Sequence, residues 1–239
     1  MVKHLERIII GGEALPEVQR EHLARYKYAT TMVKGLDVLD LACGTGYGSM
    51  LLASAGAKSV IGIDRSDDAI TYASTNYVAK NLKYRRGDAQ RVELSDGCMD
   101  AVVSFETIEH LPDDVGYLKE VRRVLRPGGL YVVSTPDRRL SGAKARFGKG
   151  SPFHVREYSR DEFIRLLETN GFATEEVLGQ RFVSWVFALL GVKLMIAVVR
   201  RLHAIPGISE GLPLGSGPTV EAPLGRRIAR FWVVRCRKL

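Results

Sequence analysis

Cysteine is scarce in this chain of 239 residues, with three copies at Cys43, Cys98 and Cys236. None of them forms a C-x-x-C pair, so the sequence predicts neither a disulfide framework nor a zinc site. The N-terminus also lacks a basic segment followed by a long apolar core, so we expect no secretory signal. Both features favour a reducing, cytoplasmic location.

Long uncharged apolar runs are missing as well. The most apolar stretch, residues 182–199, is short for a bilayer span and is interrupted by Gly191 and Lys193. We therefore expect a buried or interface helix there and no transmembrane span, with membrane contact as the alternative. Residues 182–205 are accordingly the candidate contact surface of a homo-oligomer.

Acidic residues are outnumbered by basic ones, 27 to 35, which gives a formal net charge of +8. The excess gathers in two runs, one between Arg138 and Arg156 and one from Arg226 to the C-terminus. Such runs form either a solvated basic face or a surface for an anionic partner, and both interpretations stay open.

The chain does contain a buried strand that runs into a glycine turn. Residues 38–42 are apolar apart from Asp40, and three glycines without Cβ atoms follow at Gly44, Gly46 and Gly48. A ligand could lie against such a backbone at the start of the next helix. A second strand, 59–63, ends in Asp64, where a carboxylate can accept both ribose hydroxyls. The two features predict a cofactor that contains a nucleoside.

S-adenosylmethionine (SAM) and NAD both fit that description, and two residues favour SAM. A dinucleotide-binding turn has a third glycine at G-x-G-x-x-G, and this position holds Ser49. In addition, the Asp40 carboxylate would repel a pyrophosphate but could orient the amino end of a methionine moiety. We therefore expect SAM.

Strand and helix patterns alternate along the chain, which predicts a doubly wound α/β sheet in one domain over residues 1–239. A helix over 13–34 within an N-terminal cap (1–35) should lie over the cofactor cleft. We also expect a lid loop over 136–157 and an insertion over 181–226. Strands are expected at 38–42, 59–63, 81–85, 101–105, 130–135, 174–178 and 228–236.

Four motifs resemble those of class I SAM-dependent methyltransferases in order and spacing. They are LDLACGTG at 39–46, Asp64, GDA at 87–89 and RPGG at 126–129. The resemblance covers about residues 13–180 and implies a Rossmann-like sheet of seven strands, the last one antiparallel. It also implies that Asp64 binds the ribose and that Asp88 meets the adenine amino group. The cofactor contacts implied in this way are Tyr26, Asp40, Ala42, Gly44, Gly46, Asp64, Arg65, Asp88, Ala89 and Phe105.

A second pattern, FETIEH at 105–110, lies at the carboxyl end of the expected fourth strand, where substrate meets cofactor in such sheets. If the chain turns helical at Glu106, then Glu106, Glu109 and His110 share one face. Two carboxylates and an imidazole that converge in a cleft repel one another unless a cation or a proton holds them. The alternative is that the two acids are solvated and that His110 is packed or a general base.

The E-x-x-E-H pattern resembles that of ubiquinone-pathway O-methyltransferases and small-RNA 2′-O-methyltransferases, where it binds a divalent metal. In the RNA enzymes a histidine after the lid completes the site, and His154 occupies the matching place. The resemblance implies the metal ligands Glu106, Glu109, His110 and His154, and catalytic roles for Glu106, His110 and His154. The lid and residues 6–9 further resemble methyltransferases of glycan biosynthesis, such as the methylmannose-polysaccharide 1-O-methyltransferases.

These observations predict a SAM-dependent O-methyltransferase that acts on a saccharide hydroxyl with Mg²⁺ or Mn²⁺. The alternatives are 2′-O-methylation of small RNA, methylation of a quinone or another small molecule, and a SAM-binding regulatory protein without activity. Nucleic acid is the less favoured partner, because the basic runs contain few interleaved aromatic residues and no recognisable RNA-binding module.

Overall fold

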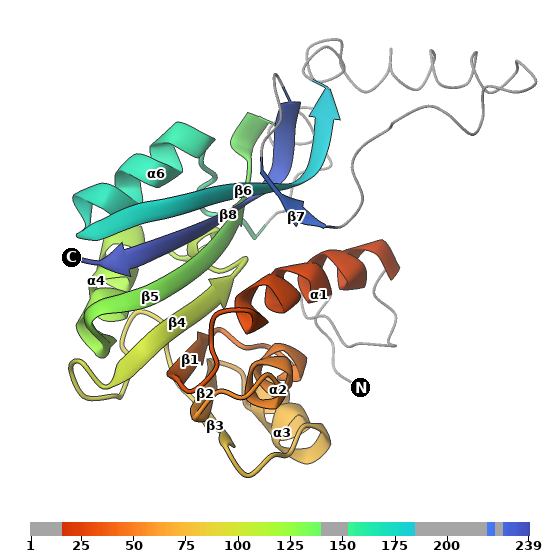
Figure 1. The fold of residues 1–239 in the computed structure, drawn as a ribbon, viewed down its shortest axis with the longest axis vertical. Helices are drawn as coiled ribbons and strands as arrows, with labels where there is room; N and C mark the ends of the chain where they lie inside the picture. The colour runs from red at the N-terminus through yellow and green to blue at the C-terminus, as the bar shows by residue number, and fades with distance from the viewer. Residues whose placement is uncertain (1–15, 140–152, 185–218, 223–226) are drawn as a thin grey trace, which may run out of the picture.

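The computed structural model describes residues 16–139, 153–184, 219–222 and 227–239. They form one eight-stranded sheet with the order β3-β2-β1-β4-β5-β8-β6-β7 (Figure 1). The strands are β1 (Asp37–Leu41), β2 (Ser59–Asp64), β3 (Leu82–Arg86), β4 (Met99–Phe105), β5 (Leu125–Pro136), β6 (Phe172–Ser184), β7 (Val220–Glu221) and β8 (Arg227–Lys238).

The sheet is parallel from β3 to β5, and β8 inserts antiparallel between β5 and β6. The predicted doubly wound sheet of seven main strands with the last one antiparallel is therefore confirmed. The additional strand β7 is a two-residue edge segment that pairs antiparallel with β6. Its two residues are too few to give a recognisable alternation of apolar and polar side chains.

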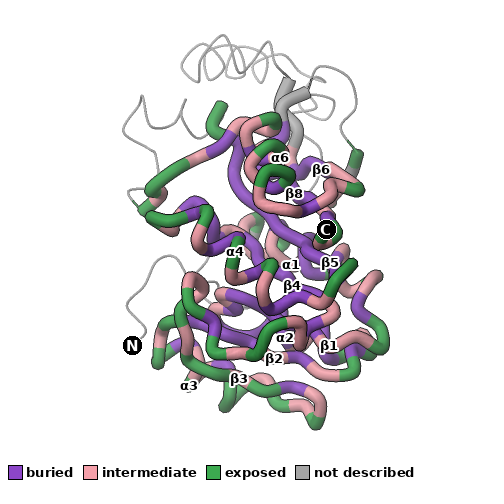
Figure 2. The backbone as a smooth tube through the Cα atoms, turned by 90° about the vertical axis from the view of Figure 1, so that its left-hand side faces the viewer, coloured by how far each residue is buried: buried purple, intermediate pink, exposed green. Residues whose placement is uncertain are grey.

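Helices cover both faces of this sheet. They are α1 (Pro16–Thr30), α2 (Tyr47–Ser54), α3 (Asp67–Asn76), the 3₁₀ helix η1 (Ile108–His110), α4 (Asp114–Val124) and α6 (Arg160–Thr169). Side chains of α4 and α6 form one buried cluster with the sheet, and side chains of α1 and α2 form the cluster on the other face. Figure 2 shows the central strands as largely buried and the outward surfaces of the helices as exposed. This is the covering that a parallel sheet of apolar strands requires.

Capping side chains set where the helices begin. The Ser66 hydroxyl accepts from the amide of Ala69 ahead of α3, and the Asp113 carboxylate accepts from the amide of Gly116 ahead of α4. Ser159 and Glu162 form a capping box at the start of α6. Each cap satisfies amide groups that the helix itself leaves unpaired, so these beginnings were predictable from the sequence.

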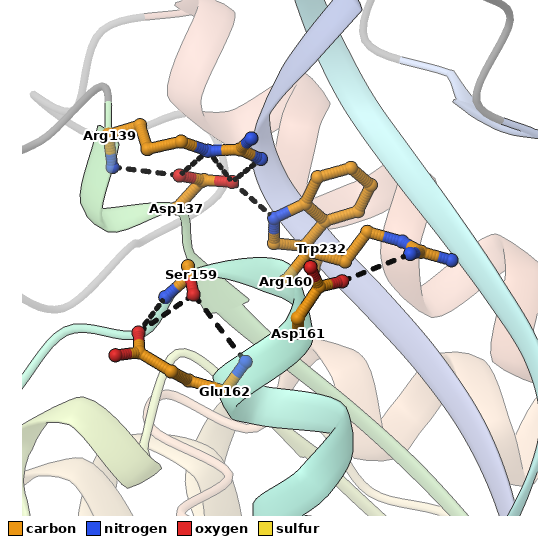
Figure 3. Close-up of polar contacts among 7 residues, drawn as sticks. All are labelled: Asp137, Arg139, Ser159, Arg160, Asp161, Glu162 and Trp232. Carbon is orange, nitrogen blue, oxygen red and sulfur yellow. Dashed lines mark hydrogen bonds and ion pairs between the residues drawn. The ribbon is translucent and has the colours of Figure 1, made fainter.

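The end of β5 is fastened by the buried carboxylate of Asp137 (Figure 3). It accepts a hydrogen bond of 2.5 Å from the indole nitrogen of Trp232 and one of 2.6 Å from the Arg139 guanidinium. Trp232 lies on β8 opposite Thr135. The Trp232 bond ties the end of β5 to β8 at the sheet edge where the candidate site lies, and Trp232 itself is buried in the core.

Two expectations change in the second half of the chain. Strand β6 continues to Ser184, so residues 182–184 are strand and the apolar helix expected from Phe182 does not begin there. In addition, the Arg235 and Arg237 side chains each form an ion pair with Glu175, so this part of the basic C-terminus is neutralised within the protein.

Several expectations lie outside the described residues: the stretch 6–9, most of the lid, and most of the 181–226 insertion with its oligomer surface. Within the described part of the chain, no helix is long and apolar enough to span a membrane.

Candidate functional site

The carboxyl ends of β1 and β4 carry two residues in the left-handed region of backbone conformation. Ala42, just after β1, has φ 63°, and Glu106, just after β4, has φ 52°. Non-glycine residues in this region are strained, and such strain concentrates at functional sites. The two strands are neighbours in the sheet, so both residues lie at one edge.

Asp40 joins three elements beneath the glycine turn. This fully buried carboxylate accepts hydrogen bonds from the Tyr26 hydroxyl of α1 at 3.0 Å and from the Ser49 hydroxyl of α2 at 2.6 Å. The Tyr26 ring in turn packs edge-on against Phe105 at the end of β4. Burial raises the pKa of Asp40 to about 7. Ser49, which replaces the third glycine of a dinucleotide site, therefore has a structural partner in Asp40.

The three glycines of the turn have different roles. Around Gly44, which has φ 56°, a Cβ would meet nothing within 4 Å, so this face is open to a ligand. A Cβ at Gly46 would overlap Ala73 and Tyr84, and one at Gly48 would overlap the Tyr26 ring. At Gly46 and Gly48 the missing Cβ thus makes room for other parts of the protein, and the expected contact of a ligand with the backbone of the turn stays a prediction.

Asp64 and Asp88 lie on adjacent strand ends. Asp64 is buried and accepts from the amides of Gly44 at 3.0 Å and Ser66 at 2.9 Å, so it holds the glycine turn and the start of α3 together. Asp88 is exposed just after β3, as is Arg65 just after β2, while Ala89 is partly buried. Their predicted contacts with the ribose and adenine stay predictions.

Glu109 is a fully buried carboxylate in η1 with one satisfied oxygen. Its Oε2 atom accepts from the Thr135 hydroxyl at 3.1 Å, whereas Oε1 is buried without a hydrogen-bond partner in the structure. Burial and the nearby charge of Glu106 raise the pKa of Glu109 well above its usual range. A cation beside Oε1 would offset both effects.

Two histidines meet at this carboxylate. The His110 and His154 rings pack edge to face with centroids 4.9 Å apart, although the residues are far apart in sequence. Potential ligand atoms of Glu109, His110 and His154 all lie within 4.8 Å of one another, an arrangement that could hold a metal ion. The structure thus brings together three of the four predicted ligands.

Glu106 lies outside this group of three. Its left-handed backbone keeps it out of η1, which begins at Ile108, so the expected common helical face with Glu109 and His110 is wrong. Its Oε1 atom accepts a hydrogen bond of 2.8 Å from Ser134 on β5. The predicted ligand role of Glu106 stays a prediction, with the observed donor set being one carboxylate and two imidazoles.

Arg25 of α1 was not anticipated by the sequence reasoning. Its side chain is fully buried, with one hydrogen bond of 2.7 Å from Nη1 to Gln180 and stacking over Phe231. Its Nε and Nη2 atoms have no hydrogen-bond partner, and among the described residues no carboxylate pairs with it. Its charge lowers the pKa of Tyr47 on the glycine turn, although burial raises that pKa more strongly. The sequence signal that could have revealed the burial of Arg25 is its position beside the apolar residues Leu23 and Tyr26 on the same helix.

Comparison with known proteins places this site in a family. A family model described as a methyltransferase domain matches residues 39–133. A probable S-adenosylmethionine-dependent methyltransferase of Mycolicibacterium smegmatis is 39% identical over 160 residues, 67% of this chain and 61% of that protein. A ubiquinone biosynthesis O-methyltransferase of Cereibacter sphaeroides is 32% identical over 186 residues, 70% of this chain and 75% of that protein.

The chain belongs to the class I SAM-dependent methyltransferases, as its motifs predicted. It spans about three fifths of the length of the M. smegmatis relative. A SAM-dependent methyltransferase structure from Mesorhizobium loti matches with a TM-score of 0.62 at 20% identity, covering 91% of this chain and all of that one. This likeness confirms the fold, while the metal-binding subtype and the glycan resemblance stay predictions.

Proposed function

We propose that this chain is a SAM-dependent O-methyltransferase that methylates a saccharide hydroxyl with the help of a divalent cation. The observation that carries the proposal is the group of Glu109, His110 and His154, in which one buried carboxylate oxygen has no hydrogen-bond partner among the described residues. The group follows β4, next to the glycine turn that follows β1. A cation bound there would hold an acceptor hydroxyl and lower its pKa.

The SAM site draws on residues of three elements. The open face of Gly44 would admit the methionine part, and the Asp64 carboxylate at the end of β2 would accept hydrogen bonds from the ribose. The two unpartnered nitrogens of Arg25 supply a fork that suits the methionine carboxylate. Asp40 orients the turn through Tyr26 and Ser49, and its oxygens retain lone pairs for the amino group.

The donor set favours Mn²⁺ over the Mg²⁺ that a site with two carboxylates would suit. Imidazole ligands suit first-row transition metals, whereas Mg²⁺ prefers oxygen ligands and water. Two of the three residues in the observed group are histidines. Zn²⁺ and Co²⁺ are the other ions that this set of ligands accommodates.

A second acceptor class, a phenol of quinone biosynthesis, is favoured by two observations. The C. sphaeroides relative carries that activity in its name, and this chain covers 75% of it. In addition, His154 is flanked by the exposed apolar side chains of Phe153 and Val155, which are 54% and 61% exposed. Apolar residues beside the cluster would suit an aromatic ring, whereas saccharides need polar partners.

The test is a panel of acceptors assayed for S-adenosylhomocysteine release in the presence of SAM and Mn²⁺. The panel contains mono- and oligosaccharides, dihydroxylated phenols and short RNAs. We expect release with a saccharide, and the Glu109→Gln variant as control should be inactive while it still binds SAM. Release with a phenol or an RNA and no saccharide would replace the proposed acceptor class.

A further inference from the structure

Both histidines of the group are held at the same ring nitrogen. Nδ1 of His110 lies 3.1 Å from the carbonyl oxygen of Phe153, and Nδ1 of His154 lies 2.6 Å from Oε1 of Glu157. Carbonyl and carboxylate oxygens accept hydrogen bonds and do not donate them. In a neutral imidazole each Nδ1 therefore carries the proton, and each Nε2 keeps its lone pair for an ion.

We propose that Glu157 is a positioning residue that fixes the ring orientation and tautomer of His154 for metal binding. This role rests on the proposed function, because it presumes a metal at the group. In metal-bound histidines the N–H group of the second ring nitrogen commonly donates a hydrogen bond to a carboxylate. This bond orients the ring and makes the ligating nitrogen more basic. Glu157 is the residue that supplies this carboxylate.

The location of His154 explains why a positioning residue is needed. His154 lies in a loop outside any helix or strand, where a ring that rotates could present either nitrogen. The backbone of this loop is already fastened to η1, because the amides of Val155 and Arg156 both donate to the carbonyl of Glu109. The bond to Glu157 then fixes the side chain on a backbone that is held in place.

The ordinary alternative is a surface ion pair without consequence for the site. Both side chains are largely shielded, with 18% of His154 and 17% of Glu157 exposed, and the bond is short. Exposed ion pairs contribute little to stability. If Glu157 is a positioning residue, its loss changes the metal affinity of the protein and the tautomer of His154. If the pair is an ordinary surface ion pair, neither changes. The stability of the protein hardly distinguishes the two cases.

The first measurement is the affinity of the full chain for Mn²⁺. It is determined from the electron paramagnetic resonance signal of the free ion. Glu157→Ala should weaken binding about 10- to 100-fold, the usual effect of losing such a partner. Glu157→Gln should stay within about threefold of wild type, because its amide oxygen accepts the same hydrogen bond. Glu168→Ala, which removes an exposed carboxylate of α6, serves as the control and should bind normally.

The second measurement determines the tautomer of His154 by nitrogen-15 NMR of the metal-free protein. The wild-type spectrum alone tests the proposal, so the test does not depend on a variant that folds. We expect the Nδ1–H form in wild type and the Nε2–H form to grow in Glu157→Ala. An Nε2–H form in wild type, or equal Mn²⁺ affinity in Glu157→Ala, would overturn the role of Glu157 while the metal site stands. If the wild-type protein binds no Mn²⁺, both the metal site and the role of Glu157 are overturned.

Discussion

At the scale of single residues, the site is built from buried ionisable groups whose protein partners are incomplete. Arg25 has two buried nitrogens without a partner, and Glu109 has one such oxygen. Leaving a buried charge unpaired is costly, so proteins keep such groups mainly where a ligand completes them. Arg25 packs against Gln180 and Phe231, and Glu109 adjoins the two histidines.

Replacing Arg25 with Met should separate ligand binding from stability. We expect SAM affinity to fall at least about tenfold, since hydrogen bonds to charged groups contribute roughly 1.5–3 kcal/mol each. The free energy of unfolding without SAM should change by less than about 2 kcal/mol, because removal of an unpaired buried charge offsets the loss of the Gln180 bond. Calorimetry with SAM and urea unfolding measure the two quantities. Unchanged SAM affinity would remove Arg25 from the site.

Asp40 should make the stability of the SAM-free protein depend on pH. Because its folded pKa of about 7 exceeds its ordinary value, the folded protein keeps a proton that the unfolded chain releases. Its contribution is therefore full below about pH 4 and is lost as the pH rises through about 7. Urea unfolding between about pH 5 and pH 8 should show a steeper fall for wild type than for Asp40→Asn. Parallel curves for the two proteins would contradict the assignment.

At the scale of elements, the glycine turn depends on a close contact between α1 and α2. A Cβ at Gly48 would overlap the Tyr26 ring, whereas one at Gly44 would meet nothing. We expect Gly48→Ala to lower the free energy of unfolding by about 1–3 kcal/mol through overpacking. Gly44→Ala should cost about 1 kcal/mol of backbone strain and weaken SAM binding.

The Tyr26→Ala background provides the control for this prediction. Without the ring, the added methyl group at position 48 has room, so Gly48→Ala should cost less there than in wild type. Equal costs in the two backgrounds, measured by urea unfolding, would show that the contact with Tyr26 is not the cause.

Most elements could be predicted from local signals, and the exceptions depend on contacts between distant residues. Ser66, Asp113 and the Ser159 capping box mark helix beginnings within a few residues, so the starts of α3, α4 and α6 follow from local sequence. Strand β6 extends to Ser184 because β8 pairs with it over its whole length, and no local pattern reveals a partner some fifty residues later. The expectation that Glu106 shares a helical face with Glu109 and His110 was wrong because the backbone at Glu106 adopts a left-handed conformation.

The candidate site was predictable to the extent that motifs mark it. Spacing pointed to Glu109 and His110, the resemblance to small-RNA methyltransferases implied His154, and the fold brings the three together. Thr135 and Arg25 act through contacts with residues on other elements, and nothing in their local sequence signals those contacts. Glu157 lies three residues after His154, so its contact is local, but the expected motifs did not include it. The buried position of Arg25 in particular depends on β6 and β8, which supply Gln180 and Phe231.

At the scale of the whole molecule, the features of the site converge on one edge of the sheet. The glycine turn, Asp64, Glu109 and Thr135 follow or end the parallel strands β1, β2, β4 and β5, which is where ligands bind in doubly wound sheets. The basic run at the C-terminus does not by itself indicate an anionic partner, because Arg235 and Arg237 pair with Glu175 within the protein. The location of the histidines at this edge therefore carries the functional account.

The most direct test of that account is an anomalous diffraction map from crystals of the full chain soaked in Mn²⁺. We predict one strong peak enclosed by Oε1 of Glu109 and Nε2 of His110 and His154. The peak should be absent in crystals of Glu109→Gln, which keeps the shape of the side chain but loses its charge. A map without a peak at this group, or with an equal peak in the variant, would contradict a metal-assisted site and leave His110 or His154 as a general base instead.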